Sequence, residues 1–334
     1  MVKAPPVCVL TPIHNAAPYL AECIESVLAQ TYSNWHYILV DNCSSDDSRQ
    51  IAETYASRDS RIRVIKTGAA SSTIASYNFL MRQLSPNAKY CKIIFAEDWI
   101  YPGCIEEMVR LAEQHPNVGL VGAYTMDGRA VLWQGPLHSV NPGRDVCREF
   151  LLGGPYLLGS MSSLLIRSEL IPKCEKIFDE EHPHREIGAC FEILRRSDYG
   201  YIHQVLSFRR QRTRETEPFA LEAGTCALGS VVDCLKYGPL FLNASEYQQA
   251  LRNTRWRYYR ILATNLFRRS PQFWRFHKDT LAAFGSRMDY KLLALCAILK
   301  VAGLLARPLH SVRDAWRWSR VENRRASQVT AGGQ

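Results

Sequence analysis

The feature that most constrains the fold is an alternation of short apolar segments with amphipathic segments along the first 125 residues. The apolar segments are rich in β-branched residues and predict buried strands at residues 7–13, 35–41, 61–66, 90–95 and 118–124. The segments between them have helical spacing and predict helices at residues 18–30, 46–57, 72–84 and 102–114. Strands that alternate with helices form βαβ units, so we expect an α/β fold on a mainly parallel sheet.

The rest of the chain changes character twice. Residues 157–167 alternate small and apolar side chains, residues 186–196 have helical spacing, and residues 201–209 predict another strand. Beyond about residue 217 the pattern predicts helices only. We therefore expect two domains, an α/β domain at residues 1–215 and an all-helical extension at residues 216–334.

The charge is distributed unevenly. The chain has 41 Lys and Arg against 32 Asp and Glu, a net charge of +9, yet residues 251–334 alone hold 17 basic and 4 acidic side chains. Four of the seven Trp also lie in that segment. Basic helices with Trp and Leu are suited to an anionic membrane surface. Packing within the molecule or against a second subunit remains an alternative, whereas no nucleic acid is expected because no nucleic-acid-binding motif is present.

The cysteines and the N-terminal sequence favour a cytoplasmic protein. The eleven cysteines include no C-x-x-C pair, and several lie in apolar runs, where a thiol acts as a small hydrophobic group. We recognise no signal peptide and no apolar run of about 18 residues that would span a bilayer. The expected location is the cytoplasm, with peripheral attachment to the inner face of the plasma membrane through the basic extension.

Carboxylates follow the predicted strands where a parallel sheet binds ligands. Neither G-x-G-x-x-G nor G-x-x-x-x-G-K-[ST] occurs, so the usual dinucleotide and P-loop phosphate cradles are absent from the sequence. Asp41 ends the second strand, and its carboxylate is suited to accept hydrogen bonds from a base or a ribose. The adjacent Glu97 and Asp98 follow the fourth strand and offer the hard oxygen ligands that Mg²⁺ or Mn²⁺ prefers.

The order of these segments resembles an inverting glycosyltransferase of family 2 with the GT-A fold. The segments are TPIHN, a helix ending in ESVLAQTY, YILVDNCSSDDS, and a strand leading into AEDWIYP. The resemblance is specific over residues 7–125, extends loosely to about residue 212, and does not cover the C-terminal helices. It implies a GT-A nucleotide-diphospho-sugar transferase fold, which is Rossmann-like with a mainly parallel mixed sheet, here followed by the basic helical extension.

The resemblance also implies roles for individual residues. The nucleotide would be bound by Thr11, Pro12, His14, Asn15, Asp41 and Asn42, with Asp41 at the base and the His14 ring beside it. Asn42 replaces a common second Asp. The family's metal motif, Asp-x-Asp, corresponds here to Phe95-Ala96-Glu97-Asp98, so Glu97 and Asp98 would hold a divalent cation and Glu97 would also face the substrate.

The catalytic base is expected in the second half of the domain. An inverting transfer needs a carboxylate that deprotonates the acceptor hydroxyl as it attacks the anomeric carbon. The family places this acid at the start of a helix, and here Glu186 opens such a helix, with Asp179, Glu180 and Glu181 as competitors. His184 is expected to contact the diphosphate or the acceptor. One or two arginines of the basic cluster at residues 209–214 are expected to reach the diphosphate.

The sequence thus predicts an enzyme of polysaccharide biosynthesis in the EC 2.4 class. It would move a sugar from a nucleoside-diphosphate sugar to a hydroxyl of a glycan or lipid-linked glycan, with an Mg²⁺ or Mn²⁺ cofactor. Oligomerisation remains open. The alternative is a catalytically degenerate GT-A module that binds nucleotide sugars without turnover, because Phe95, Glu97 and Asn42 all depart from the family pattern.

Overall fold

The computed structural model describes residues 4–128, 130–132, 135–171, 177–210, 225–264, 266 and 270–302. The chain divides into two compact units, residues 1–251 and residues 252–334. The predicted domain boundary at residues 215 and 216 lies outside the described residues and stays a prediction.

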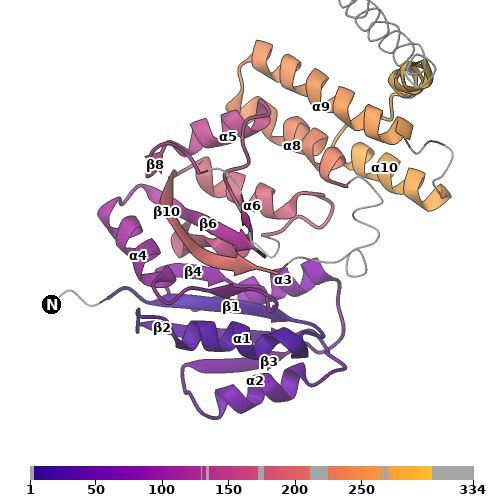
Figure 1. The fold of residues 1–334 in the computed structure, drawn as a ribbon. Coiled ribbons are helices and arrows are strands. Elements are labelled where there is room, and N and C mark those ends of the chain that lie inside the picture. Colours follow the sequence, from indigo (N-terminus) through magenta and orange to yellow (C-terminus); the bar gives the residue numbers. More distant parts are fainter. Residues whose placement is uncertain are drawn as a thin grey trace, which may run out of the picture. The chain divides into compact units, whose positions relative to one another are not determined.

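The first unit is built on a twisted sheet (Figure 1). Among the described residues the strand order is β3-β2-β1-β4-β9-β6-β10-β5, with β7 paired to β6 and β8 paired to β10. The strands are β1 (Val7–Ile13), β2 (Trp35–Asp41), β3 (Ile62–Lys66), β4 (Tyr90–Ile93), β5 (Trp99–Ile100), β6 (Val118–Asp127), β7 (Ala130–Leu132), β8 (Val140–Asn141), β9 (Leu164–Arg167) and β10 (Asp198–Arg209).

The pairing confirms the predicted mixed, mainly parallel sheet. Strands β3, β2, β1 and β4 are parallel to their neighbours, as are β6 and β10. Strand β9 is antiparallel to both β4 and β6 and joins the two parallel groups. The carboxyl ends of β1, β2 and β4 therefore meet at one edge, where open α/β sheets bind ligands.

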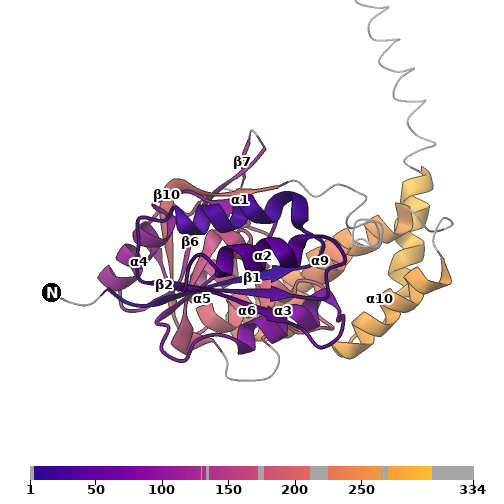
Figure 2. The ribbon, with the colours of Figure 1, turned by 90° about the horizontal axis from the view of Figure 1, so that it is seen from below.

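Two sets of helices cover the two faces of this sheet (Figure 2). Helices α1 (Ala17–Leu28), α2 (Ser48–Ala56) and α4 (Cys104–Gln114) pack on the face that holds Val7 and Val9. Helices α3 (Thr73–Arg82), α5 (Gly143–Leu151) and α6 (Arg185–Leu194) pack on the face that holds Cys8 and Leu10. Successive residues of a strand point to opposite faces, so the continuous apolar run in β1 serves both cores.

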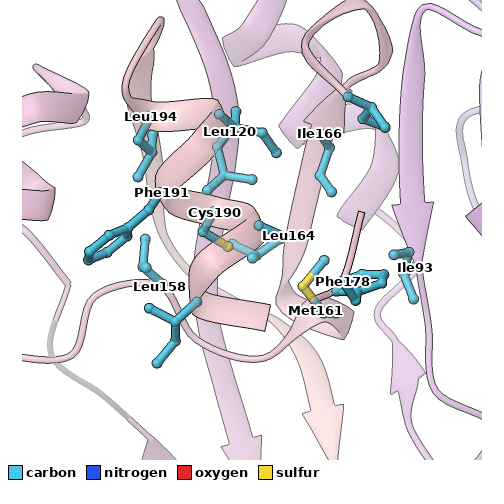
Figure 3. Packing of buried hydrophobic residues seen from close by; sticks show 14 of the residues in the cluster. Ile93, Leu120, Leu158, Met161, Leu164, Ile166, Phe178, Cys190, Phe191 and Leu194 are labelled. Atoms are coloured by element: carbon cyan, nitrogen blue, oxygen red, sulfur yellow. The ribbon is translucent and has the colours of Figure 1, made fainter. Parts of the chain in front are cut away.

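The core beneath α6 is shown in Figure 3. Side chains from β4, β6, β9 and α6 meet there with the short 3-10 helix Met161–Ser163 and with Phe178. A second 3-10 turn, Ser168–Leu170, follows β9. The helical spacing noted at residues 186–196 corresponds to α6, whose apolar face, made of Ile187, Cys190, Phe191 and Leu194, is buried.

Helix α8 (Thr225–Phe241) belongs to the same core. Its Tyr237 and Phe241 rings lie 4.9 and 5.6 Å from the ring of Phe191 in α6, at steep interplanar angles. Edge-to-face pairs of this kind add to the free energy gained by burying the rings. A helix beyond residue 216 thus completes the packing around α6. Helix α9 (Ala244–Thr264) follows and crosses the division between the units.

The second unit contains helix α10 (Pro271–Ala283) and a helical segment at residues 290–302. Ser270 caps α10 by accepting a hydrogen bond from the Phe273 N–H. The Tyr258 hydroxyl lies 2.9 Å from Nδ1 of His277, and Arg255 forms an ion pair with Asp289. Over the described ranges, no helix has the length and apolar character needed to cross a bilayer.

Candidate functional site

A cavity of about 620 Å³ opens at the carboxyl ends of β1, β2 and β4. It is lined by the turn after β1, by the first residue after β2, by the start of α3, by the residues after β4 and by the end of β10. These residues are Pro12, Ile13, His14, Asn15, Ala16, Tyr19, Asn42, Ser71, Ser72, Thr73, Ser76, Tyr77, Phe95, Ala96, Glu97 and Arg210. Five of the predicted site residues, Pro12, His14, Asn15, Asn42 and Glu97, are therefore brought together.

The turn after β1 is tied to the turn after β2. Asn15 has a φ of 49°, a left-handed conformation that Asn tolerates better than most residues. Its side-chain oxygen accepts a hydrogen bond from the Ser45 N–H at 2.8 Å. Nδ1 of His14 lies 3.0 Å from the carbonyl oxygen of Asn42. This contact orients the exposed His14 ring at the mouth of the cavity.

The Asn42 side-chain amide holds the turn after β3 through hydrogen bonds. Its Nδ2 donates to the Ser71 carbonyl at 2.9 Å, and its Oδ1 accepts from the Ser71 N–H at 3.0 Å. Thr67 also donates to Oδ1, at 3.3 Å. An aspartate at this position has no N–H to donate, so the amide holds Ser71 in a way that the family's second Asp does not.

Thr11 and Asp41 lie behind the lining. The Thr11 hydroxyl is fully buried, donates to the Ile94 carbonyl at 2.7 Å and lies 2.8 Å from the Tyr37 hydroxyl. One oxygen of the buried Asp41 carboxylate accepts from the Ser44 N–H at 3.1 Å. The other, Oδ2, is buried and has no hydrogen-bond partner within the described part of the chain. A buried acceptor of this kind carries a free-energy cost that a bound donor would remove.

The two acids after β4 lie in different surroundings. Glu97 lines the cavity. Asp98 is buried, and its two oxygens accept hydrogen bonds from the Ser162 hydroxyl (2.7 Å) and the Arg210 N–H (3.1 Å). The strand was predicted to run to Phe95 but ends at Ile93, because the Phe95 N–H turns away from the sheet to the Ser162 hydroxyl. The strand therefore ends before the two acids, of which Glu97 lines the cavity and Asp98 is buried.

Aromatic rings and one arginine complete the walls. The Phe95 ring stacks on Tyr77, with centroids 5.4 Å apart and an interplanar angle of 23°. Arg210 forms an ion pair with Glu22 and lies over the Tyr19 ring, 4.5 Å from its centroid. The cavity therefore combines a flat apolar wall with one carboxylate and one guanidinium.

The predicted acceptor-side residues lie outside this lining. Glu186 is half-buried in the first turn of α6, where the helix N-terminus stabilises a negative charge. His184 is the residue before α6, and its Nδ1 lies 2.7 Å from the Asp233 carboxylate of α8. The competitor Asp179 pairs with Lys236 at 2.9 Å. The role of each of these residues stays a prediction.

Residues 8–164 match the protein family described as Glycosyl transferase family 2. Over this stretch, a little under half of its length, the chain has the sequence pattern of a family 2 glycosyltransferase.

Relatives that are named glycosyltransferases agree with the match. Glycosyltransferase GlyG of Streptococcus pneumoniae is 28% identical over 188 residues, 53% of this chain and 59% of GlyG. The putative glycosyltransferase EpsE of Bacillus subtilis is 34% identical over 123 residues, 36% of this chain and 44% of EpsE. The matched regions thus span less than two thirds of these relatives.

Solved structures show that the protein has the GT-A fold. The S. aureus TarS fragment 1–349 bound to UDP-GlcNAc superposes with a TM-score of 0.62 at 16% identity, covering 84% of this chain and 80% of that fragment. The mannosyltransferase PcManGT of Pyrobaculum calidifontis, in complex with GDP-Man and Mn²⁺, gives a TM-score of 0.53 at 15% identity, covering 91% and 81%. The GT-A expectation from the sequence is confirmed.

A divalent cation fits the residues of this site in one particular way. Among the described ranges, no group of three or more His, Cys, Asp or Glu side chains is arranged to hold a metal ion. Mg²⁺ at nucleotide sites, however, is usually held by one or two carboxylates together with substrate phosphates. Glu97 supplies one such carboxylate to the cavity, whereas the oxygens of Asp98 already accept two protein hydrogen bonds. The metal role of Asp98 stays a prediction.

The sequence analysis missed Tyr19, Ser76 and Tyr77 as lining residues. Ser76 and Tyr77 lie one turn beyond Ser72 and Thr73, so a helical (i, i+4) projection from the predicted cap would have placed them on the same face. Tyr19 lies in the first turn of α1, and no comparable signal marks it.

Proposed function

We propose that this protein transfers a sugar from a nucleoside-diphosphate sugar to a hydroxyl of a glycan or lipid-linked glycan, with inversion at the anomeric carbon. The observation that carries the proposal is the cavity at the carboxyl ends of β1, β2 and β4, whose lining includes five of the motif residues. TarS and PcManGT, which share the fold, were solved with UDP-GlcNAc and GDP-Man.

The donor would be held by groups on three sides of the cavity. The base lies beside the His14 ring, and an imide or amine N–H of the base donates to the buried Oδ2 of Asp41, which satisfies that acceptor. The Arg210 guanidinium lies on the same wall as Glu97 and faces the diphosphate. A divalent cation held by Glu97 and the phosphate oxygens would add positive charge that stabilises the departing diphosphate.

The transfer step needs one proton acceptor. As the acceptor hydroxyl oxygen attacks the anomeric carbon, Glu186 takes its proton, the bond to the diphosphate breaks, and the nucleoside diphosphate leaves. The position of Glu186 in the first turn of α6 supports this role, because a negative charge is favoured near a helix N-terminus. The Arg210 guanidinium stabilises the charge that develops on the leaving group.

A screen of nucleotide sugars tests the proposal. UDP-GlcNAc and GDP-mannose are incubated with the protein and Mn²⁺, and both binding and release of UDP or GDP are measured. Release that is abolished in Glu186→Gln while donor binding persists supports the transferase. Binding of a donor without any release would instead support the nucleotide-sugar-binding module, which the replacement of an acidic family position by Phe95 favours. Absence of binding by every nucleotide sugar contradicts both.

We also propose that the second unit attaches the protein to an anionic membrane surface. Residues 252–302 hold 11 Lys and Arg against 2 Asp. In the helical segment 290–302, Leu295, Ile298, Leu299 and Val301 are each between 46% and 64% exposed, at helical spacing and close to Lys291 and Lys300. An exposed apolar stripe with flanking lysines is typical of helices that lie in the interface of an anionic bilayer.

Vesicle co-sedimentation tests this attachment. The full chain should sediment with vesicles that contain phosphatidylglycerol, but not with pure phosphatidylcholine, at about 0.15 M salt, where only short-range charge contacts persist. The double substitution Leu295→Glu and Ile298→Glu should abolish sedimentation. Leu137→Glu is the matched control, because Leu137 is 94% exposed in the first unit. Equal sedimentation of all three proteins would contradict the proposal.

A further inference from the structure

Helix α8 packs against the N-terminal end of α6 through three of its residues, which follow one another at intervals of one helical turn. Gly229 leaves room for the His184 ring, which a Cβ atom at that position would overlap. One turn later Asp233 meets His184, and the Tyr237 hydroxyl donates to the Gly188 carbonyl at 3.2 Å. The contacts at positions 229, 233 and 237 lie on one face of α8.

Asp233 is a fully buried carboxylate placed between two imidazoles. Its Oδ2 lies 2.7 Å from Nδ1 of His184, and its Oδ1 lies 3.4 Å from Nε2 of His182. Nδ1 of His182 accepts a hydrogen bond from the His184 N–H at 3.0 Å, so a neutral His182 ring carries its proton on Nε2, toward Asp233. A buried carboxylate requires a cationic or hydrogen-bonding partner, and the short contact identifies His184 as that partner.

We propose that Asp233 is a positioning residue, which holds His184 as an imidazolium and thereby fixes the first turn of α6. The first hydrogen bond of that helix runs from the Gly188 N–H to the His184 carbonyl at 3.0 Å. His184 therefore joins the α8 carboxylate to the backbone of α6. The consequence for Glu186, which lies two residues after His184, rests on the proposed transferase function.

The surrounding charges agree with an imidazolium at His184 and a neutral ring at His182. Burial lowers the pKa of His184, but the hydrogen bond to Asp233 and a contact with Cys226 outweigh it and raise that pKa to about 9. Burial, together with the charges of Lys236, His184 and Arg185, lowers the pKa of His182 to about 3, although Asp179 opposes this shift. Burial raises the pKa of Asp233, and the contacts with His184 and Lys236 oppose that rise.

Titration of the histidines by NMR is the direct test. In the full-length wild-type chain, the His184 ring is expected to titrate near pH 9, well above the ordinary value of 6.5. A His184 pKa at or below 6.5 would overturn the proposal. Because this measurement uses the unmodified protein, it decides the pairing whether or not a variant folds.

Substitution of Asp233 then tests the positioning. Asp233→Asn keeps the shape of the side chain but removes its charge, so the His184 pKa should fall toward 6.5 or below. Amide exchange at Gly188 should rise by about tenfold or more as the first turn of α6 loosens. Lys236→Gln is the matched control: Lys236 lies on the same helix, is 33% exposed, and should leave Gly188 exchange unchanged. Unchanged exchange in Asp233→Asn would refute the positioning.

Gly229→Ala is a second variant that is expected to loosen the first turn of α6. Its methyl group would displace the His184 ring while leaving the carboxylate in place, so Gly188 exchange should again rise. With UDP-GlcNAc or GDP-mannose, whichever is turned over, Asp233→Asn should lower kcat by about tenfold or more and leave the donor KM within about twofold. If kcat is retained, the positioning of Glu186 is refuted and the transferase stands. If wild type turns over neither donor, the transferase fails, while the NMR result still decides the pairing.

Discussion

The two adjacent acids after β4 are expected to have different effects when each is replaced by Ala: loss of Asp98 should lower the stability, and loss of Glu97 should lower the donor affinity. Asp98→Ala removes a buried carboxylate that accepts from the Ser162 hydroxyl and the Arg210 N–H. A hydrogen bond to a charged group contributes about 1.5–3 kcal/mol, so the two bonds together contribute about 3 kcal/mol or more. For a unit of this size, each kcal/mol shifts Tm by about 2–4 °C, which gives a fall of roughly 6–12 °C.

Glu97→Ala should leave the folded state nearly intact. The Glu97 side chain is partly exposed at the cavity wall, where substitutions usually change the free energy of unfolding by less than about 0.5 kcal/mol. The expected loss is instead in donor affinity, and only in the part of that affinity that depends on Mn²⁺, because we propose that Glu97 is the carboxylate that would hold the cation beside the diphosphate.

Thermal unfolding followed by circular dichroism measures the first quantity, and calorimetric titration of UDP with and without Mn²⁺ measures the second. We expect Tm to fall in Asp98→Ala but not in Glu97→Ala. We expect the Mn²⁺-dependent affinity for UDP to fall in Glu97→Ala. These expectations would be refuted if Asp98→Ala unfolded at the wild-type temperature and lost only the Mn²⁺-dependent affinity. In that case the two acids would act as a metal-binding pair, as the sequence alone suggests.

Two further predictions concern stability. The folded-state pKa of His182 is lowered to about 3, so His182 contributes stability that is present above pH 6.5 and is lost as the pH falls toward 3. The folded-state pKa of His184 is raised to about 9, so His184 contributes stability that is present below pH 6.5 and is lost as the pH rises through 9. Urea unfolding should therefore show both contributions in full near pH 6.5, and removal of the α8 carboxylate should flatten the alkaline side only. Gly143→Ala should destabilise the protein by about 2 kcal/mol or more, because its Cβ would overlap the carbonyl oxygens that end α6 and precede β10, whereas Gly103→Ala, with open space around it, should unfold like wild type. Equal Tm values for the two glycine variants would contradict this.

The sheet and its helices were predictable because each signal is local. Strands β1, β2 and β6 begin where their apolar runs begin, and Ser72, the first residue of the helix predicted at residues 72–84, caps α3, since its hydroxyl accepts from the Ala75 N–H. Asp46 illustrates the limit of such reasoning. It begins the predicted helix at residues 46–57, where an Asp is a typical cap, yet Asp47 occupies the cap position of α2, while the Asp46 carboxylate accepts from the N–H groups of both Ser48 and Ala17. The bond to Ala17, at the start of another helix, depends on tertiary structure.

The predictable part of the site is the part formed where the carboxyl ends of the parallel strands meet at one edge of the sheet. Pro12, Asn42 and Glu97 line the cavity for that reason. Thr11 does not, because it follows Val7 and Val9 on the side of β1 that faces α1 and bonds within the interior. A motif match identifies the position of a residue but not the direction of its side chain, which the two-residue period of the strand determines.

The point where the net charge of the sequence changes sign agrees better with the division into compact units than the point where the predicted secondary structure becomes all-helical. The net positive charge begins at residue 252, where the compact units divide, whereas residues 216–251 hold one Lys against four acids. One of those acids is Asp233, which the sequence presents as an ordinary helix residue and the structure buries against α6. Helix α8 packs into the core of the first unit, whereas the net positive charge lies in the second unit, for which we propose attachment to an anionic surface. The packing of α8 and the division of the chain into units therefore both group α8 with the α/β sheet, although the family match ends at residue 164.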